Sequence, residues 1–280
     1  MKIIVTGGRG FIGSHFVNHA INNGHDVLVV DNEYAPPVGE KNNKASYFKK
    51  CVSGMFPTKA FDPDIVVHLG EYSRVEASFD NSLFAMNNII GNISQVLDFC
   101  KVNKCKLVYA GSSTKFGDAI SPYSLSKAAN TDLVKKYCDL FDIDYAITYF
   151  YNAYGLGERS EGEYSTVIEK FIQAKINDLT VTVNGTGEQL RNFTHVDDIV
   201  NGLYLAAING KGDGYGIGSD QCYSINDIIS MIGLKYKNSE NTKGNRNSAK
   251  LDTEKTKKLG WTAKKSLNDY IKKRIDLHIK

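Results

Sequence analysis

A glycine-rich segment near the start of the chain is the feature that most restricts its fold. Thr6-Gly7-Gly8-Arg9-Gly10-Phe11-Ile12-Gly13 follows the apolar run Ile3-Ile4-Val5 and precedes a helical pattern near 11–23. Glycines at these spacings suit a tight turn, a close approach of a ligand to the backbone, and close packing of the helix on the strand. The segment predicts a strand, a turn and a helix whose first N–H groups can face a pyrophosphate.

The first 150 residues alternate between strand and helix patterns. Short β-rich apolar runs occur at 27–30, 65–67, 107–109 and 145–147, and helical patterns near 79–102 and 122–141. Helices of this length serve as right-handed crossovers between parallel strands. We therefore expect an α/β fold, a Rossmann-type doubly wound parallel sheet, with residues 1–150 as a dinucleotide-binding domain.

The pattern changes after Asn152. Glycine-rich loops, short strands and scattered helices follow, with a strong turn signal at Asn184-Gly185-Thr186-Gly187. We expect residues 151–280 to form a smaller C-terminal α/β lobe that binds the substrate, with segments near 192–218 returning to the first domain.

Composition narrows the class of protein. A chain of 280 residues that is 42% hydrophobic can bury a large core. Its five cysteines are odd in number and contain no Cys-x-x-Cys, which argues against a disulfide framework and a zinc cluster. No stretch approaches the ~18 apolar residues of a membrane span. We expect a cytoplasmic protein with reduced thiols, without a metal and without a membrane partner.

The net charge of +3 is unevenly distributed. From residue 231 onward there are 14 lysines and arginines against 5 acids, a net charge of +9. A solvated surface and a contribution to holding a diphosphate both explain this excess. No basic motif with interleaved aromatic residues indicates a nucleic-acid partner.

An acidic residue ends the second apolar run. Asp31 lies about 20 residues beyond the glycine segment, where a carboxylate binds the ribose hydroxyls of NAD and would repel the 2′-phosphate of NADP. Arg9, beside the second glycine of that pattern, could pair with such a phosphate, or it could be an ordinary exposed arginine. We predict NAD as the cofactor.

A tyrosine and a lysine form the candidate proton-transfer pair. Tyr123 and Lys127 lie four positions apart in a predicted helix, which places them on one face. A phenol, with a pKa of about 10, is a poor base at neutral pH, but an adjacent ammonium stabilises the phenolate.

Together these segments resemble a known family. With the glycine segment, Asp31, His68-Leu69-Gly70, Ser112 and the Tyr123/Lys127 pair in order, the chain resembles the extended short-chain dehydrogenase/reductases. Within them it is similar to the NAD-dependent nucleotide-sugar epimerase/dehydratase family, of the UDP-glucose 4-epimerase type. Three further segments are similar to motifs of that family: Phe150-Tyr151-Asn152-Ala153-Tyr154-Gly155, residues 185–198 and Leu259-Gly260-Trp261.

The resemblance implies roles for particular residues. The catalytic residues would be Ser112, Tyr123 and Lys127. The cofactor would be bound by Gly7, Gly10, Phe11, Ile12, Gly13, Asp31, Asn32, Leu69, Gly70, Ser73, Asn88, Tyr123, Lys127 and Tyr151. The nucleotide-diphosphate sugar would be bound by Ser112, Tyr123, Asn152, Arg191 and Arg246. Guanidinium groups suit diphosphate oxygens, which agrees with the two arginines.

The implied reaction is C4 epimerisation of a nucleotide-diphosphate hexose through a transient 4-keto intermediate, with UDP-glucose/UDP-galactose as the typical pair. Tyr123 would take the hydroxyl proton while NAD accepts the hydride. Family dehydratases usually carry an Asp-Glu pair directly after the Ser/Thr, whereas this chain has Ser113 and Thr114. We therefore rank a 4-epimerase above a 4,6-dehydratase and above an NAD(P)-dependent ketosugar reductase.

Three further expectations accompany this reading. Glu71-Tyr72 replaces the small residues that usually follow the His-Leu pair, so this wall of the cleft should be bulkier and more charged. The resemblance implies a homodimer, with the helices near 79–102 and 122–141 pairing with those of a second subunit. The alternative from a different class is a dinucleotide-binding regulatory or scaffold protein that has kept the fold without turnover.

Overall fold

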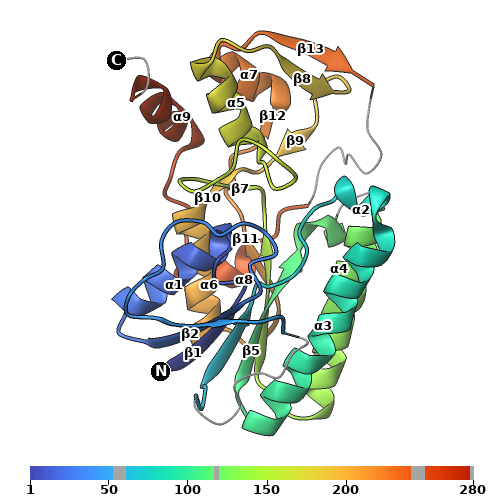
Figure 1. The fold of residues 1–280 in the computed structure, drawn as a ribbon, viewed down its shortest axis with the longest axis vertical. Coiled ribbons are helices and arrows are strands. Elements are labelled where there is room, and N and C mark those ends of the chain that lie inside the picture. Colours follow the sequence, from blue (N-terminus) through green and yellow to red (C-terminus); the bar gives the residue numbers. More distant parts are fainter. Residues whose placement is uncertain (53–60, 117–119, 241–249, 278–280) are drawn as a thin grey trace.

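The computed structural model describes residues 1–52, 61–116, 120–240 and 250–277, arranged as a larger and a smaller lobe (Figure 1). A seven-stranded parallel sheet forms the centre of the larger lobe. Its strands, in spatial order, are β11 (Gly212–Ile217), β6 (Tyr145–Phe150), β5 (Lys106–Ser112), β4 (Ile65–His68), β1 (Lys2–Thr6), β2 (Asp26–Asp31) and β3 (Ser46–Lys49).

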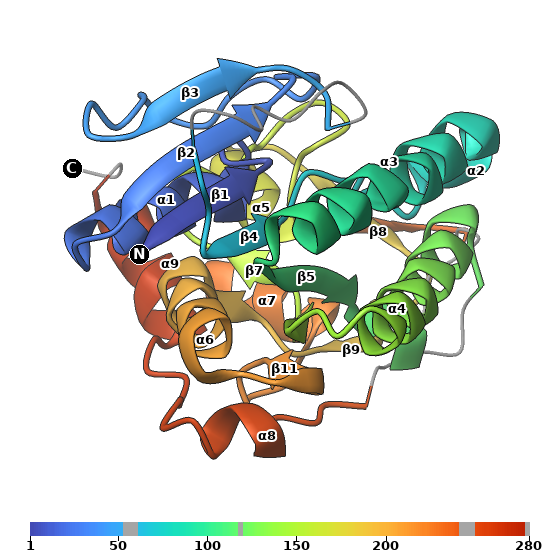
Figure 2. The same ribbon diagram turned by 90° about the horizontal axis from the view of Figure 1, so that it is seen from below.

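Side chains of β1 show why these strands are apolar on both faces. Ile4 packs with residues of α3 (Ser82–Asn103) and α4 (Pro122–Leu140), whereas Ile3 and Val5 pack with α1 (Phe11–Asn22) and α6 (Val196–Asn209). Successive side chains of a strand point to opposite faces, and helices cover both faces here (Figure 2). The doubly wound α/β fold is confirmed, and the three predicted helices of the first 150 residues are present.

The start of α4 is fixed by its own residues. Ser121 accepts the Ser124 N–H through Oγ at 3.0 Å, and Ser124 Oγ accepts the Ser121 N–H at 2.8 Å. This reciprocal capping box, followed by a proline at the first helical position, defines the first turn of the helix. Tyr123 lies in that turn and Lys127 one turn later.

The smaller lobe has a separate apolar core. Its elements are β7 (Ala153–Tyr154), α5 (Val167–Ile176), β8 (Val181–Asn184), β9 (Leu190–Arg191), β10 (Thr194–His195), β12 (Tyr223–Ser224), α7 (Ile225–Ile232), β13 (Tyr236–Ser239) and α9 (Leu267–Asp276). Side chains of α5, α7 and α9 form the core of this lobe with Val181 and Val183 of β8. The described residues also include three short helices: α2 (Ala77–Asp80), the 3₁₀ turn η1 (Ser113–Phe116) and α8 (Glu254–Lys257).

The chain returns to the larger lobe between β10 and β12. Helix α6 packs on one face of the sheet beside α1, and β11 extends the sheet by pairing with β6. Both lie within the segment near 192–218 that was expected to return. The division into a cofactor domain and a substrate domain remains a prediction. Within the described residues, no helix combines the length and apolar character needed to cross a bilayer.

Candidate active site

A cavity of about 580 Å³ lies at the carboxyl ends of the central strands, with walls from both lobes. The loops after β1 and β4 meet there, at the point where the strand order of the sheet reverses, which is where doubly wound sheets bind ligands. Fifteen of the predicted site residues line it: Gly7, Gly10, Phe11, Ile12, Gly13, Asp31, Asn32, Leu69, Gly70, Ser73, Asn88, Ser112, Tyr123, Lys127 and Asn152.

Two glycines of the loop are packed too closely to carry a side chain. Gly7 has φ = 69°, and a Cβ there would lie 2.7 Å from the Gly70 backbone. A Cβ on Gly13 would lie 2.1 Å from the Gly7 carbonyl oxygen. Gly10 precedes α1 without a side-chain cap, so this helix presents its N-terminus to the cavity without a protein side chain bound to it. The loop therefore fits a dinucleotide pyrophosphate.

Asp31 ends β2 at the cavity wall. Its carboxylate accepts the Arg9 N–H at 2.9 Å and the Glu33 N–H at 2.7 Å, which fixes its orientation. The Arg9 guanidinium is buried elsewhere: Nη2 donates to the Gly39 carbonyl at 3.1 Å, and the group lies 5.9 Å from the Tyr47 ring centroid. The Asp31 carboxylate thus lines the cavity, whereas Arg9 does not.

Ser112 and Tyr123 approach the cavity from adjacent elements. Ser112 ends β5, and its hydroxyl lies 2.8 Å from the Thr114 hydroxyl. Tyr123 packs against a small buried cluster that contains Tyr72 and Ile89, and its N–H donates to Ser78 Oγ at 3.3 Å. These contacts leave the phenol of one residue and the hydroxyl of the other in the same cavity.

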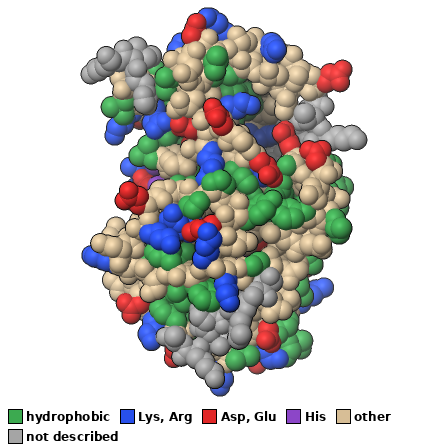
Figure 3. Space-filling view, viewed as in Figure 1, with side chains coloured by type: hydrophobic (Ala, Val, Ile, Leu, Met, Phe, Trp, Pro, Cys, Tyr) green, Lys and Arg blue, Asp and Glu red, His purple; other side chains and the backbone are tan. Residues whose placement is uncertain are grey.

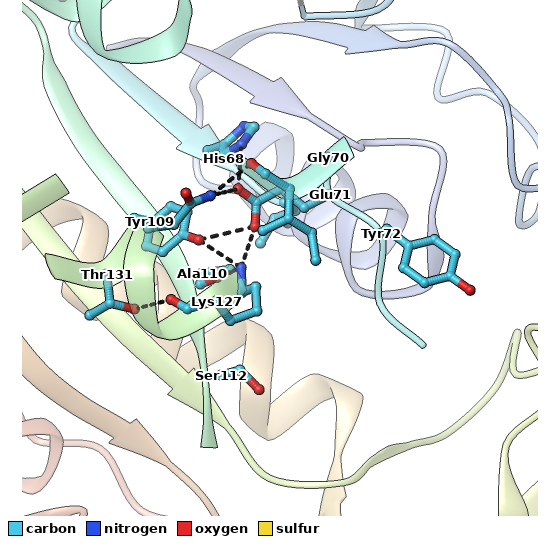
Figure 4. A network of polar contacts seen from close by, with 12 residues as sticks. His68, Gly70, Glu71, Tyr72, Tyr109, Ala110, Ser112, Lys127 and Thr131 are labelled. Atoms are coloured by element: carbon cyan, nitrogen blue, oxygen red, sulfur yellow. Dashed lines mark hydrogen bonds and ion pairs between the residues drawn. The ribbon is translucent and has the colours of Figure 1, made fainter. Parts of the chain in front are cut away.

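Lys127 is the most heavily engaged residue of the site. Its ammonium contacts the Glu71 carboxylate and donates to the Tyr109 hydroxyl at 2.9 Å and to the Ala110 carbonyl at 2.5 Å (Figure 4). An ammonium has three N–H donors. All three are accounted for by protein acceptors, so a ribose hydroxyl can be bound by Lys127 only in exchange for one of them.

The two charges stabilise each other. Burial alone would raise the pKa of Glu71, but the Lys127 ammonium and His68 lower it to about 2. Burial opposes the charged form of Lys127, but the attraction of Glu71 outweighs it and holds the pKa of the ammonium well above its usual value. Both groups are therefore ionised at neutral pH.

Two predicted residues do not line the cavity, and the position of a third lies outside the described residues. Tyr151 is buried, with 1% of its surface exposed, and its hydroxyl donates to the Lys250 carbonyl at 2.8 Å. Arg191 lies in β9 and donates to the Leu190 carbonyl at 2.8 Å. Arg246 falls outside the described residues. The assignments of Tyr151 and Arg191 to ligands stay predictions that the cavity lining does not support.

Other cavity residues escaped the sequence-based prediction. Arg74 donates to the Tyr164 carbonyl at 3.1 Å and lies over the Tyr164 ring, 4.8 Å from its centroid. Glu158 accepts the Gly155 N–H at 2.7 Å, and burial raises its pKa to about 7. Neither residue belongs to a motif of the sequence. Each lies in an irregular segment and is positioned by contacts that sequence patterns do not reveal. Glu71, in contrast, was visible as an unusual charge beside the His-Leu pair.

The fold and the site define a class of protein. A doubly wound sheet with a glycine loop at its switch point, and a serine, tyrosine and lysine in the same cavity, is the arrangement of a dinucleotide-dependent enzyme. The particular family follows from a match over residues 3–218: the chain belongs to the NAD-dependent epimerase/dehydratase family.

Individual relatives agree with this assignment. A putative UDP-glucose 4-epimerase from Methanocaldococcus jannaschii is 29% identical over 98% of this chain and 97% of its own length. A dTDP-D-glucose 4,6-dehydratase from Dictyostelium discoideum is 29% identical over 82% of this chain, which spans 61% of that protein. The crystal structure of UDP-glucuronic acid 4-epimerase from Bacillus cereus, with UDP-glucuronic acid and NAD, has a TM-score of 0.89 at 26% identity, covering 99% of this chain and 98% of that one.

Proposed function

We propose that this protein is an NAD-dependent nucleotide-sugar epimerase that inverts C4 of a nucleotide-diphosphate hexose through a 4-keto intermediate. The observation that carries the proposal is the meeting of Ser112, Tyr123 and Lys127 with the glycine loop and Asp31 in one cavity. Relatives of both the epimerase and the dehydratase type are similar to the chain, so the choice between them rests on the site.

The residues divide the chemistry between them. Tyr123 accepts the proton of the C4 hydroxyl and returns it at the end of the cycle, while the Ser112 hydroxyl donates a hydrogen bond to the same oxygen. The glycine loop and Asp31 would hold NAD, which would supply a reversible acceptor for the C4 hydride. Inversion also requires the sugar to present its opposite face to the cofactor within this cavity before C4 is reduced again.

The two positions after Ser112 do not supply the acid and base that a dehydratase needs. Elimination of water needs a proton donor and acceptor beside the sugar. Ser113 and Thr114 occupy the positions after Ser112, and the Thr114 hydroxyl is paired with Ser112. Among the described residues, the acids that line the cavity are Asp31, Glu71 and Glu158. The first is placed for the cofactor and the second is paired with Lys127.

The reductase alternative is weakened by Arg9. Its guanidinium is buried against Tyr47 and hydrogen-bonded to Gly39, so recognition of an NADP 2′-phosphate would require it to leave these contacts. Asp31 remains at the cavity wall to repel that phosphate.

The activity can be tested without knowing the sugar. Purified protein should be incubated with a panel of UDP-, dTDP-, GDP- and CDP-hexoses, with and without added NAD(P)(H), and the products analysed by NMR. We expect interconversion of C4 epimers without net consumption of cofactor. Stoichiometric oxidation of NADPH would identify a reductase instead, and a 4-keto-6-deoxy product would identify a dehydratase.

The variant Tyr123→Phe separates catalysis from binding. We expect it to lose at least 100-fold in turnover because the proton acceptor is removed, while NAD affinity measured by calorimetry changes little. Full activity of this variant would contradict the assigned role. Absence of turnover in the wild type on every sugar, with NAD still bound, would favour the regulatory or scaffold protein.

The same proposal includes a homodimer. Apolar side chains are exposed along α3 and α4, including Leu83, Met86 and Ile90 at helical spacing, and Leu133 and Leu140. Figure 3 shows hydrophobic side chains on the part of the surface that covers these helices. Two long helices that expose an apolar stripe fit pairing with the same helices of a second copy.

A further inference from the structure

Glu71 is a buried carboxylate whose two oxygens contact four side chains. Besides Lys127, Oε2 accepts the Tyr109 hydroxyl at 3.0 Å. Oε1 accepts the Asn130 amide at 3.1 Å and lies 3.3 Å from His68 Nε2. Only 5% of the side chain is exposed. Contacts from β4, β5 and α4 thus hold this carboxylate in a single place (Figure 4).

This ion pair is hard to explain by stability alone. Removing two charges from water costs free energy that their attraction only partly returns, and apolar side chains of similar volume often stabilise a core at least as well. Glu71 and Lys127 nevertheless lie at the wall of the cavity, and Lys127 is one helical turn from Tyr123 in α4. Their position points to a role in the chemistry of that tyrosine.

The pair presents a different charge to Tyr123 from that of a lysine alone. A lone ammonium stabilises a nearby phenolate, whereas an ammonium in contact with a carboxylate has almost no net charge at that distance. We propose that Glu71 is a positioning residue for the proposed epimerase reaction. Its carboxylate holds the Lys127 ammonium in place and offsets its charge, so that Tyr123 loses its proton beside a neutral ion pair and not beside a lone ammonium.

Several other polar groups surround Tyr123 and are the same in the wild type and in variants of Glu71. Arg74, from the segment after β4, is close enough to interact electrostatically with Tyr123. Tyr72 packs beside it and donates its own hydroxyl to Glu163 at 2.5 Å. Ser78 of α2 accepts the Tyr123 N–H. His68 contacts Glu71, and Tyr109 contacts both Glu71 and Lys127. Substitution of Glu71 changes the identity of none of these residues.

The titration of Tyr123 tests the proposal without any sugar substrate. Protein labelled with ¹³Cζ-tyrosine is titrated by NMR with NAD present, and Tyr123→Phe assigns the signal. In Glu71→Gln, which keeps the size and removes the charge, we expect the phenolate midpoint to fall by about one pH unit. In Glu71→Gln with Asn130→Asp, which moves the carboxylate across an existing hydrogen bond, at least half of that change should be reversed. An unchanged midpoint in Glu71→Gln would overturn the proposal.

A charge-neutral variant covers the case in which Glu71→Gln does not fold. Glu71→Gln with Lys127→Met removes both charges, so neither partner is left buried and unpaired. By the proposal, its Tyr123 midpoint stays within about half a pH unit of the wild type, because the net charge beside the phenol is unchanged. A rise of more than one unit would show that Lys127 acts as a lone ammonium, and would overturn the proposal. Both results stand whether or not the protein is an epimerase, since no turnover is measured.

Discussion

Glu158 gives the stability of the protein a pH dependence that can be assigned to one residue. Burial raises its pKa from 4.5 to about 7, against the hydrogen bond from the Gly155 N–H that lowers it. The folded state therefore favours the protonated acid. The contribution of Glu158 to the free energy of unfolding is therefore largest below pH 4.5. It decreases as the pH rises from 4.5 to about 7, and it stays at its lowest value above pH 7.

The variant Glu158→Gln should remove this pH dependence. At pH 8 we expect its free energy of unfolding to exceed that of the wild type by about 1–3 kcal/mol, and at pH 4.5 to differ by less than ~0.5 kcal/mol. Urea denaturation at both pH values measures this. Glu161→Gln, at an exposed position three residues away, is the control and should change neither value. Equal stabilisation at both pH values would mean that ionisation of Glu158 is not the cause.

Contacts between distant residues limit what could be predicted at this scale. The sequence shows a charge at Glu71, but not that it reaches Lys127, which lies 56 positions further along. That pairing depends on β4 and β5 being neighbours in the sheet, so that the end of one strand meets the helix that follows the other. Sequence spacing within a helix could place Lys127 beside Tyr123, but not beside Glu71.

Elements formed by local sequence were predicted most reliably. The strand, glycine loop and helix of residues 2–22 depend on neighbours in sequence, and they form as expected. The end of β6 shows where a motif is insufficient. Phe150 and Asn152 line the cavity, whereas Tyr151 between them points into the core with α3 and α4. Alternation explains the opposite directions of Phe150, which ends β6, and Tyr151, because adjacent side chains of an extended chain face opposite ways. Asn152, with φ = 33°, is no longer extended.

The glycine loop supports a prediction at the level of the element. In Gly13→Ala, the new Cβ would meet the Gly7 carbonyl oxygen at 2.1 Å and the Gly8 Cα at 2.8 Å, so the backbone must move. We expect NAD affinity to fall at least tenfold and stability to fall by about 1–3 kcal/mol. Gly91→Ala in α3 is a matched control, since nothing lies within 4 Å of its Cβ. It should stabilise the protein by about 0.5–1 kcal/mol and leave NAD affinity unchanged, as calorimetry can show.

At the scale of the whole molecule, the exposed stripe on α3 and α4 predicts the assembly. Sedimentation velocity at micromolar concentration should show a dimer. Leu83→Glu with Leu133→Glu should give a folded monomer, because four charges would be buried at the shared interface of the two copies. Leu179→Glu, at a position 57% exposed on the smaller lobe, should leave the dimer intact. A monomeric wild type would refute the homodimer.

The course of the chain between the lobes has a mechanical consequence. The backbone passes from one lobe to the other after β6, again between β9 and α6, and again between β11 and β12. Near the end, Trp261 is anchored in the core of the larger lobe, and Leu267 six residues later in that of the smaller one. Each of these segments connects the two lobes. Because residues at both ends of the last connection are packed in a core, a wide separation of the lobes would have to expose those residues. We therefore expect ligands to enter and leave through small movements of the cavity rim.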